Sequence, residues 1–332
     1  MKNVTAYCLD WHLKSSDAFR DLLVAPLKNY MNIVLTAWDG DQILKNPKKG
    51  DTLLFCMLPP PQELLDREDL KLVWIPMWDQ AQGYNEEWWG ALPKHLRIIA
   101  FSEAIHKQAI QARLDVIRLA YYKDPASLKP ATWDHGRIIY YWNRVGMVGP
   151  EFIDKLCRSL HAEELLFKPN TDPRIEENKF YELPTVIGKT KITVIQETSE
   201  RADFLRQIER ANIVLSPRLT EGVGMVFLES LARGCAVIAH DAPTMNEYIN
   251  HGSNGVLLKD DYVPFKDRLS GAINKSVAQP NVPFLLTEKQ PWAKIGRMNY
   301  KRLGDNAAQK SAEGYNNWLE STKKLIDFLS IL

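Results

Sequence analysis

The 332-residue sequence has few cysteines, almost no net charge and no long apolar run. Its four cysteines (Cys8, Cys56, Cys157 and Cys235) stand singly in apolar stretches without C-x-x-C spacing. This arrangement is typical of reduced core residues and argues against a disulfide framework or a zinc site. Lys and Arg (42) nearly balance Asp and Glu (41). The net charge of +1 therefore disfavours nucleic acid as a partner, because such binding usually needs a basic face.

Targeting and cofactor signals are also missing. The N-terminal stretch lacks the apolar region of a secretory signal, and no run approaches the ~20 apolar residues of a membrane span. We therefore expect a cytoplasmic protein, with peripheral contact at the inner face of a membrane left open. The sequence has no Asp-x-Asp after a strand, no histidine cluster, no G-x-x-x-x-G-K-[ST] and no G-x-G-x-x-G after the first strand. We expect no metal and no cofactor, and ATP or nicotinamide chemistry is disfavoured.

Two series of alternating strand and helix patterns run along the chain, separated by a proline-containing segment at 123–130. In the first series we expect strands at 3–9, 32–37, 52–58, 72–77, 97–101 and 116–120, and helices at 16–29 and 103–113. In the second we expect strands at 137–142, 164–167, 192–195, 212–215, 236–239 and 255–258, and helices at 151–160, 200–210, 225–233 and 243–250. Gly234 is placed to end the helix at 225–233.

This alternation predicts the α/β class, with parallel sheets covered by helices. We expect two Rossmann-like, doubly wound domains at 1–128 and 129–305, facing a central cleft. The amphipathic segment 306–332 is predicted to be a helix that packs back on the first domain. Ligands of such sheets bind beyond the carboxyl ends of the strands.

The most informative run is RLTEGVGMVFLE, from Arg218 to Glu229. Its two glycines let backbone N–H groups approach a diphosphate, and the start of the following helix favours negative charge. Glu229 lies more than one turn into that helix and can accept hydrogen bonds from hydroxyl groups beyond the phosphates. Glu221 precedes the helix and can reach a second polyol. The run therefore indicates sugar transfer from a nucleotide sugar.

The segment SPRLTEGVGMVFLESLARGCAVIAHDAPTMNEYINHGSNGVLL, from Ser216 to Leu258, resembles the E-x7-E signature of the retaining glycosyltransferases of family 4, which have the GT-B fold. The resemblance implies a metal-independent hexosyltransferase. It would move a sugar from a UDP- or GDP-sugar to a hydroxyl of a glycan or lipid-linked acceptor, in the synthesis of surface polysaccharide or glycoconjugate. It also implies that the N-terminal domain binds the acceptor and the C-terminal domain binds the nucleotide sugar.

The resemblance implies a role for each matching residue. Glu221 would contact the transferred sugar, Glu229 the ribose, and Arg144 the leaving phosphate. The diphosphate would be held by the backbone of Gly222, Val223, Gly224, Met225 and Val226. Three departures from the family pattern stand out. Gly149 replaces the usual lysine, Val223 replaces a phenylalanine, and DWHLK at 10–14 replaces a glycine pair. The charge missing at position 149 would come from one of three candidates: Arg218, Lys168 or Arg174.

In the first domain, polar and aromatic residues follow the predicted strands. Asp79 is a candidate catalytic residue that would touch the acceptor or the scissile oxygen, and His12 and Lys14 lie at the same predicted edge. For each of them a solvated loop residue is the alternative. Three tryptophans also stand at strand ends, and they would form either an acceptor platform or part of the core: Trp11, Trp38 and Trp78. The aromatic and basic segment 85–97 indicates either a buried helix or a membrane contact.

Two other functions remain open. A nucleotide-sugar epimerase of the same fold would need carboxylate bases in the first domain, and Asp10, Asp39 and Asp79 are available. A non-catalytic nucleotide-sugar-binding partner of a transferase is suggested by Gly149, which stands where the family has a lysine.

Overall fold

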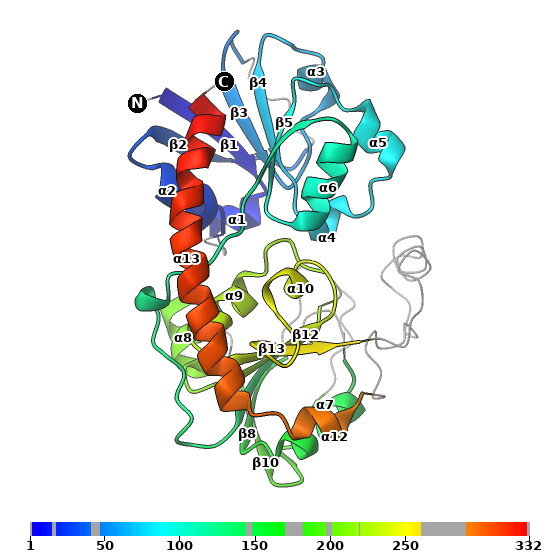
Figure 1. The fold of residues 1–332 in the computed structure, drawn as a ribbon, viewed down its shortest axis with the longest axis vertical. Helices are drawn as coiled ribbons and strands as arrows, with labels where there is room; N and C mark the ends of the chain where they lie inside the picture. Colours follow the sequence, from blue (N-terminus) through cyan, green and yellow to red (C-terminus); the bar gives the residue numbers. More distant parts are fainter. Residues whose placement is uncertain are drawn as a thin grey trace. The chain divides into compact units, whose positions relative to one another are not determined.

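The structure is a computed structural model that describes residues 2–14, 18–40, 47–143, 148–169, 182–196, 201–218, 220–259 and 290–330. The chain forms two compact units, each built around its own sheet (Figure 1). The first unit contains Met1–Tyr122, Thr220–Met225 and Glu313–Leu332. The second contains Lys123–Leu219 and Val226–Ala312.

The first unit has a six-stranded sheet in the order β2-β1-β3-β4-β5-β6, in which all neighbours are parallel. The strands are β1 (Lys2–Cys8), β2 (Met31–Ala37), β3 (Thr52–Cys56), β4 (Lys71–Ile75), β5 (Arg97–Ala100) and β6 (Asp115–Arg118). Strand β3 is buried along its whole length, because a parallel sheet is covered on both faces.

Short helices follow these strands. They are α1 (Asp10–Lys14), the π-helix η1 (Arg20–Val24), α2 (Ala25–Leu27), α3 (Gln62–Leu65), α4 (Trp78–Ala81), α5 (Glu86–Ala91) and α6 (Glu103–Gln111). The expected helix at 16–29 is confirmed over residues 18–27, which are helical throughout, but residues 20–24 form a π-helix and not a regular α-helix. Pro26 has no N–H to donate to the carbonyl group of Leu22, so a regular α-helical ladder is interrupted there. Residues 16 and 17 of the predicted helix lie outside the described residues.

The second unit has a seven-stranded sheet in the order β13-β12-β11-β7-β8-β10-β9. The strands are β7 (Ile138–Trp142), β8 (Glu164–Lys168), β9 (Val186–Ile187), β10 (Thr190–Val194), β11 (Ile213–Ser216), β12 (Ala236–His240) and β13 (Gly255–Leu258). Only β9 is antiparallel to its neighbour in this described sheet. The chain winds from β7 to β8 in one direction and from β11 to β12 in the other. A topological switch point therefore lies between the adjacent strands β7 and β11.

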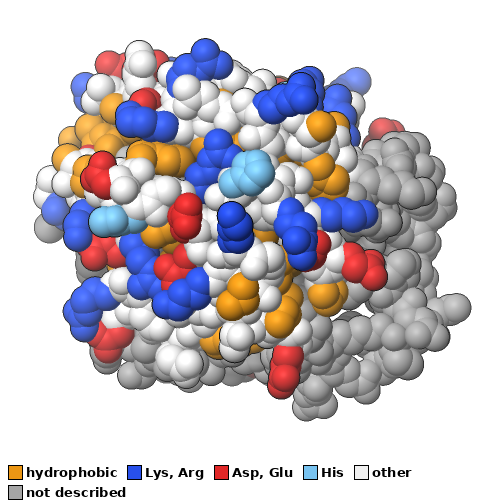
Figure 2. Space-filling view, turned by 90° about the horizontal axis from the view of Figure 1, so that it is seen from below, with side chains coloured by type: hydrophobic (Ala, Val, Ile, Leu, Met, Phe, Trp, Pro, Cys, Tyr) orange, Lys and Arg blue, Asp and Glu red, His pale blue; other side chains and the backbone are white. Residues whose placement is uncertain are grey.

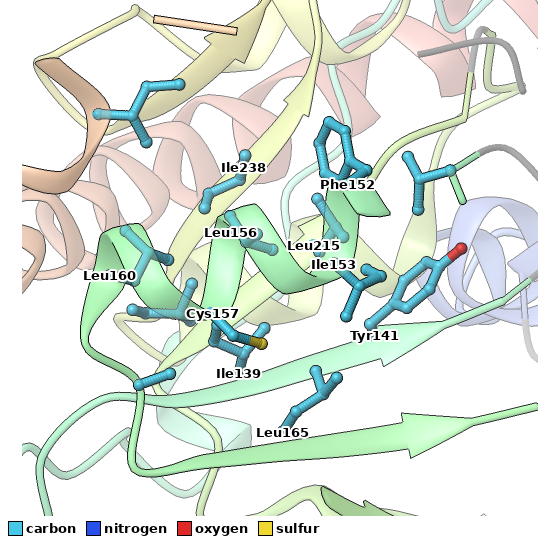
Figure 3. Close-up of a cluster of buried hydrophobic side chains, with 14 of the residues drawn as sticks. Ile139, Tyr141, Phe152, Ile153, Leu156, Cys157, Leu160, Leu165, Leu215 and Ile238 are labelled. Carbon is cyan, nitrogen blue, oxygen red and sulfur yellow. The ribbon is translucent and has the colours of Figure 1, made fainter. Parts of the chain in front are cut away.

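Helix α7 (Pro150–Leu160) covers one face of this sheet. Figure 3 shows Phe152, Ile153 and Leu156 of α7 lying over Ile139 and Tyr141 of β7. The other helices described for the unit are η2 (Pro125–Ser127), α8 (Arg201–Ile208), α9 (Met225–Ala232), α10 (Met245–Tyr248) and α12 (Trp292–Gly296). Gly234 follows α9 with a φ of +81°, as a glycine that ends a helix should.

The last helix, α13 (Tyr300–Ser330), begins in the second unit and ends in the first. Within the first unit, Trp318 of α13 packs edge-on against Tyr121 and lies 6.2 Å from the ring of Phe101. In the described ranges, no helix combines the length and the apolar character that crossing a membrane requires. The two sheets confirm the predicted α/β, doubly wound class.

All four cysteines are buried and carry free thiols, as expected for reduced core residues. Burial raises the pKa of Cys157 to about 12 and that of Cys235 to about 11.

On the surface, charges of both signs are mixed: Figure 2 shows Lys and Arg side chains interspersed with Asp and Glu over one face. This mixture agrees with the net charge of +1.

Candidate functional site

The sequence run from Arg218 to Glu229 follows the carboxyl end of β11, beside the switch point. Arg218 is half-buried, and Leu219 lies outside the described residues. The segment Thr220–Met225 belongs to the first unit, whereas Val226 and the rest of α9 belong to the second. The predicted motif therefore divides between the two units immediately after the first residue of α9.

Within the first unit, Gly222 of the motif packs against the start of α4. A Cβ atom on Gly222 would lie 3.0 Å from the Cβ atom of Met77 and 3.1 Å from Oδ1 of Asp79. Thr220 Oγ1 accepts a hydrogen bond from Gln82 Nε2 at 3.1 Å. A side chain at position 222 would therefore crowd Met77 and Asp79, and the first unit places the candidate residue Asp79 directly beside the motif.

The two glutamates of the motif are both half-buried. Glu221 precedes α9, and Glu229 lies in its second turn, as the sequence predicts. The apolar side of α9 is buried through Phe227, Leu228 and Leu231. Glu229 thus lies on a helix that the core fixes in place, and its carboxylate keeps partial exposure. The roles of Glu221 and Glu229 stay predictions.

The carboxyl end of β7 carries a polar residue that sequence reasoning missed. Asn143 is 1% exposed, and its backbone N–H donates to the carbonyl oxygen of Lys168 at 2.9 Å. The hydroxyl group of Tyr141 donates to Asn143 Oδ1 at 2.8 Å. Asn143 Nδ2 is buried and has no hydrogen-bond partner. The available sequence signal was a polar residue ending the apolar strand, next to Arg144, which itself lies outside the described residues.

Position 149, where the resemblance leads one to expect a lysine, has a structural role here. Gly149 is the N-cap residue of α7, and no side chain caps this helix end. Of the three candidates for the missing charge, Lys168 ends β8. Its Nζ lies 4.5 Å from the ring centroid of Trp142 and 4.8 Å from that of Phe204. These cation–π contacts hold a positive charge near the carboxyl edge of the sheet. Arg174 lies outside the described residues.

The candidate acceptor-binding residues that follow strands of the first unit differ in their surroundings. Trp38 is 4% exposed and packs edge-on against Phe55, so the structure favours the core interpretation for this residue. Trp78 is half-buried at the start of α4 and packs against the same core cluster. The side chains of Trp11 and Lys14 lie outside what is described.

Three more polar residues follow the strands of this unit. His12 Nε2 contacts the sulfur atom of Met57, and its ring packs edge-on against Phe19. Asp10 and Asp39 are exposed after β1 and β2. The functional roles suggested for His12, Asp10 and Asp39 stay predictions.

The aromatic segment at 85–97 forms part of the core of the first unit. Trp89 is 2% exposed, and Trp88 packs edge-on against Trp74 and stacks on Tyr84 at 3.9 Å. Lys94 Nζ donates to the carbonyl oxygen of Ala112 at 2.6 Å. These contacts favour the buried-helix interpretation of the segment. Peripheral membrane contact is a prediction that they do not test.

No group of three or more His, Cys, Asp or Glu side chains within the described ranges is arranged to hold a metal ion. Groups that can donate to an anion follow the neighbouring strands β7 and β8: the amide of Asn143 after β7 and the ammonium group of Lys168 at the end of β8.

Comparison with known proteins finds one matching family model and several similar solved structures. A family model described as glycosyl transferases group 1 matches residues 179–283, which contain the run from Arg218 to Glu229. Comparison with curated protein sequences finds no match.

Several solved structures are similar over the whole chain. Sucrose-phosphate synthase from Thermosynechococcus elongatus has 12% sequence identity and a TM-score of 0.59, with 100% of both chains covered. HepE from Anabaena, solved with UDP-glucose, has 13% identity and a TM-score of 0.59, also with 100% of both chains covered. A glycosyltransferase from Rickettsia africae has 12% identity and a TM-score of 0.58, with 98% of this chain and 97% of that chain covered. These similarities and the two Rossmann-like sheets define the GT-B fold. The family match supports nucleotide-sugar glycosyl transfer.

Proposed function

We propose that this protein is a retaining glycosyltransferase that moves a hexosyl-type sugar from a UDP- or GDP-sugar to a hydroxyl of a glycan or lipid-linked acceptor. The family match over 179–283 carries the proposal, because it includes both motif glutamates and the glycines between them. A similar structure, that of HepE, holds UDP-glucose, which supports a nucleotide sugar as donor. Surface polysaccharide or glycoconjugate synthesis is the proposed setting.

In this proposal each residue of the motif binds a different part of the donor. Glu229 accepts hydrogen bonds from the ribose, and Glu221 contacts the transferred sugar. Backbone N–H groups from Gly222 to Val226 hold the diphosphate. The φ of +79° at Gly224 supports this role, since a residue with a side chain rarely adopts that backbone geometry.

The same proposal names the residues that stabilise the negative charge on the leaving phosphate as the donor is cleaved. Arg144 stabilises the leaving phosphate, and Lys168 or Arg218 supplies the second positive charge. Preorganised cations of this kind lower the barrier because they act where negative charge appears in the transition state. Asp79 contacts the acceptor, and its closeness to Gly222 supports a place beside the donor motif.

The reaction breaks the bond between the anomeric carbon and the phosphate oxygen. The acceptor oxygen forms its bond to the same face of that carbon, and its proton passes to the departing phosphate oxygen. The configuration at the anomeric carbon is retained because the new bond forms on the face that the leaving phosphate occupied. No metal ion and no enzyme nucleophile take part in this scheme.

A donor and acceptor panel tests the proposal. UDP-, GDP- and dTDP-sugars are incubated with simple glycosides and lipid-linked saccharides, in EDTA, and both free nucleotide and product are measured. Released nucleotide with a glycosylated product of retained configuration is the expected result. An isomerised donor without transfer would instead identify an epimerase. Binding without turnover would favour the non-catalytic partner, which the glycine at position 149 suggests.

A further inference from the structure

The segment that carries Glu221 is held against helix α4 on both sides of the glutamate, within the first unit. On one side, Thr220 Oγ1 accepts a hydrogen bond at 3.1 Å from Nε2 of Gln82, the C-cap residue of α4. On the other side, a Cβ atom on Gly222 would lie only 3.0 Å from the Cβ atom of Met77, the N-cap residue. Successive Cα atoms are about 3.8 Å apart, so a residue with both neighbours fixed has little freedom. The two ends of α4 therefore set the backbone position of Glu221.

The hydrogen bonds of Gln82 fix which end of its amide faces the motif. Its Nε2 donates to the carbonyl oxygen of Asp79 at 3.0 Å as well as to Thr220 Oγ1. A carbonyl oxygen can only accept, so the nitrogen of the amide and not its oxygen faces these two partners. Both N–H bonds of the amide are thus used, one within α4 and one across to the motif segment.

The same side chain links two residues of the proposed site. The carbonyl group of Asp79, the residue proposed to contact the acceptor, accepts one of the two hydrogen bonds. Thr220, which accepts the other, directly precedes Glu221, the residue proposed to contact the transferred sugar. Transfer requires reacting atoms about 3–3.5 Å apart in a defined orientation. Gln82 joins the backbone segments that carry the two carboxylates, and it is placed to fix the spacing between them.

The contribution of Gln82 to global stability should be small. Its Oε1 is buried, and the part of the chain that the structure describes supplies no hydrogen-bond partner for it. An unsatisfied buried acceptor is unfavourable, and this cost offsets the two hydrogen bonds that Nε2 donates. Removal of the side chain should therefore release the motif segment without a large loss of stability.

We propose that Gln82 is a positioning residue that, through Thr220, holds Glu221 in register with Asp79. The role rests on the proposed function, in which Glu221 contacts the sugar and Asp79 the acceptor. Neither the E-x7-E run nor the family resemblance contains Gln82. Its contact with Thr220 joins residues that are 138 positions apart, and only the tertiary structure brings them together.

Steady-state kinetics with an active donor and acceptor pair test this role. Gln82→Ala should lower kcat ~3–30-fold, because even a shift of about 1 Å in a positioned group can cost 100-fold. Thr220→Val, which removes the accepting oxygen at nearly constant volume, should lower kcat ~3–10-fold. Thr220→Ser keeps that oxygen and should stay within ~2-fold of wild type. The affinity for UDP or GDP should change less than ~2-fold in each variant, since the core holds α9 and Glu229 in place independently.

A double variant shows whether the two residues act through one contact. Gln82→Ala combined with Thr220→Val should be no slower than Gln82→Ala alone, because the second substitution removes a hydrogen bond that is already lost. Two independent effects would instead multiply.

Gln62→Ala is the matched control. Gln62 belongs to α3, which like α4 has four residues, and its Nε2 donates to Asp66 Oδ1 at 2.7 Å. Gln62→Ala should leave kcat at the wild-type value. A Gln82 that served only the fold would behave in the same way: Gln82→Ala would lower the melting temperature and leave the kcat of the folded protein unchanged.

The outcomes separate this role from the proposed function. Wild-type protein that transfers no sugar from any donor of the panel would overturn both. Active wild-type protein with unchanged kcat in Gln82→Ala and Thr220→Val would overturn the positioning role alone, as would equal losses in Thr220→Val and Thr220→Ser. If Gln82→Ala does not fold, the two Thr220 variants decide the question. A loss of kcat in Thr220→Val that serine at the same position restores supports the role.

Discussion

The backbones of Gly304 and Gly234 lie in direct contact. A Cβ atom added to Gly304 would collide with the carbonyl oxygen of Gly234, and one added to Gly234 would lie 3.6 Å from the carbonyl oxygen of Gly304. Gly304 belongs to α13, and Gly234 ends α9 just before β12. Helix α13 can pass this close to the turn because Gly304 lacks a side chain.

Gly304→Ala should therefore destabilise the protein although alanine favours helices. The alanine gains about 1 kcal/mol of helix propensity, but overpacking a tight contact typically costs 1–3 kcal/mol. A net loss of up to about 2 kcal/mol is expected by urea denaturation. Gly90→Ala in α5 is the control: nothing lies within 4 Å of its added Cβ atom, so it should be neutral or stabilising. Equal stability of the two variants would contradict the contact.

The carboxylate of Glu164 is tied to two elements of the second unit. Arg210 donates to both of its oxygens, at 2.9 and 2.7 Å, and Thr193 also donates to it. Burial acts to raise the pKa of Glu164. The hydrogen bonds from Arg210 and Thr193 and the positive charges of Arg210 and Lys191 outweigh burial, so the pKa falls below its ordinary value of 4.5.

A lowered pKa gives Glu164 a pH-dependent contribution to stability. The contribution is complete above pH 4.5 and is lost as the pH falls through the folded-state pKa. The Arg210 side chain is 46% exposed, so solvent screening limits the effect to about 1 kcal/mol. Glu164→Gln should be less stable than wild type by this amount at pH 7, and the difference should shrink towards pH 3. A difference that is constant with pH would rule out the ion pair as its source.

Much of the sheet architecture was predictable because parallel strands buried on both faces appear as continuous apolar runs. The runs at 52–58 and 72–77 match β3 and β4 within two residues at each end. Strand β9 (Val186–Ile187) was missed, since two residues carry no periodicity. The π-helix η1 was also missed, because an apolar pattern does not show how Pro26 changes the backbone hydrogen bonds.

The candidate site was predictable only where it is local in sequence. The glycines and glutamates from Glu221 to Glu229 form one continuous run, so their chemistry can be inferred from spacing. The amide of Asn143 depends instead on a hydrogen bond from Tyr141 and on its complete burial. Both properties arise from tertiary packing, and a single polar residue at a strand end does not reveal them.

Trp38 is another residue whose tertiary packing could not be inferred from its position at a strand end. Its role has a direct test. Because the side chain packs against Tyr7 and Phe55, Trp38→Ala should lower the free energy of unfolding by about 3–5 kcal/mol. Below the melting temperature of the variant, the acceptor KM should stay within about twofold of wild type. Trp38→Phe, which keeps much of the apolar volume, should lose less stability. A large rise in acceptor KM with little change in stability would restore the acceptor-platform hypothesis for this residue.

The two glutamates of the motif should respond differently to the same substitution. Glu229→Ala should weaken binding of the nucleoside diphosphate about tenfold or more, because ribose hydroxyls lose a charged acceptor. Glu221→Ala should mainly lower kcat, since the contact to the transferred sugar contributes most in the transition state. Isothermal titration with UDP or GDP and steady-state kinetics separate the two effects. Glu320→Ala on α13, an exposed helical glutamate, is the control and should leave both unchanged. Wild-type binding and turnover in both motif variants would refute the assignment of Glu221 and Glu229 to the donor.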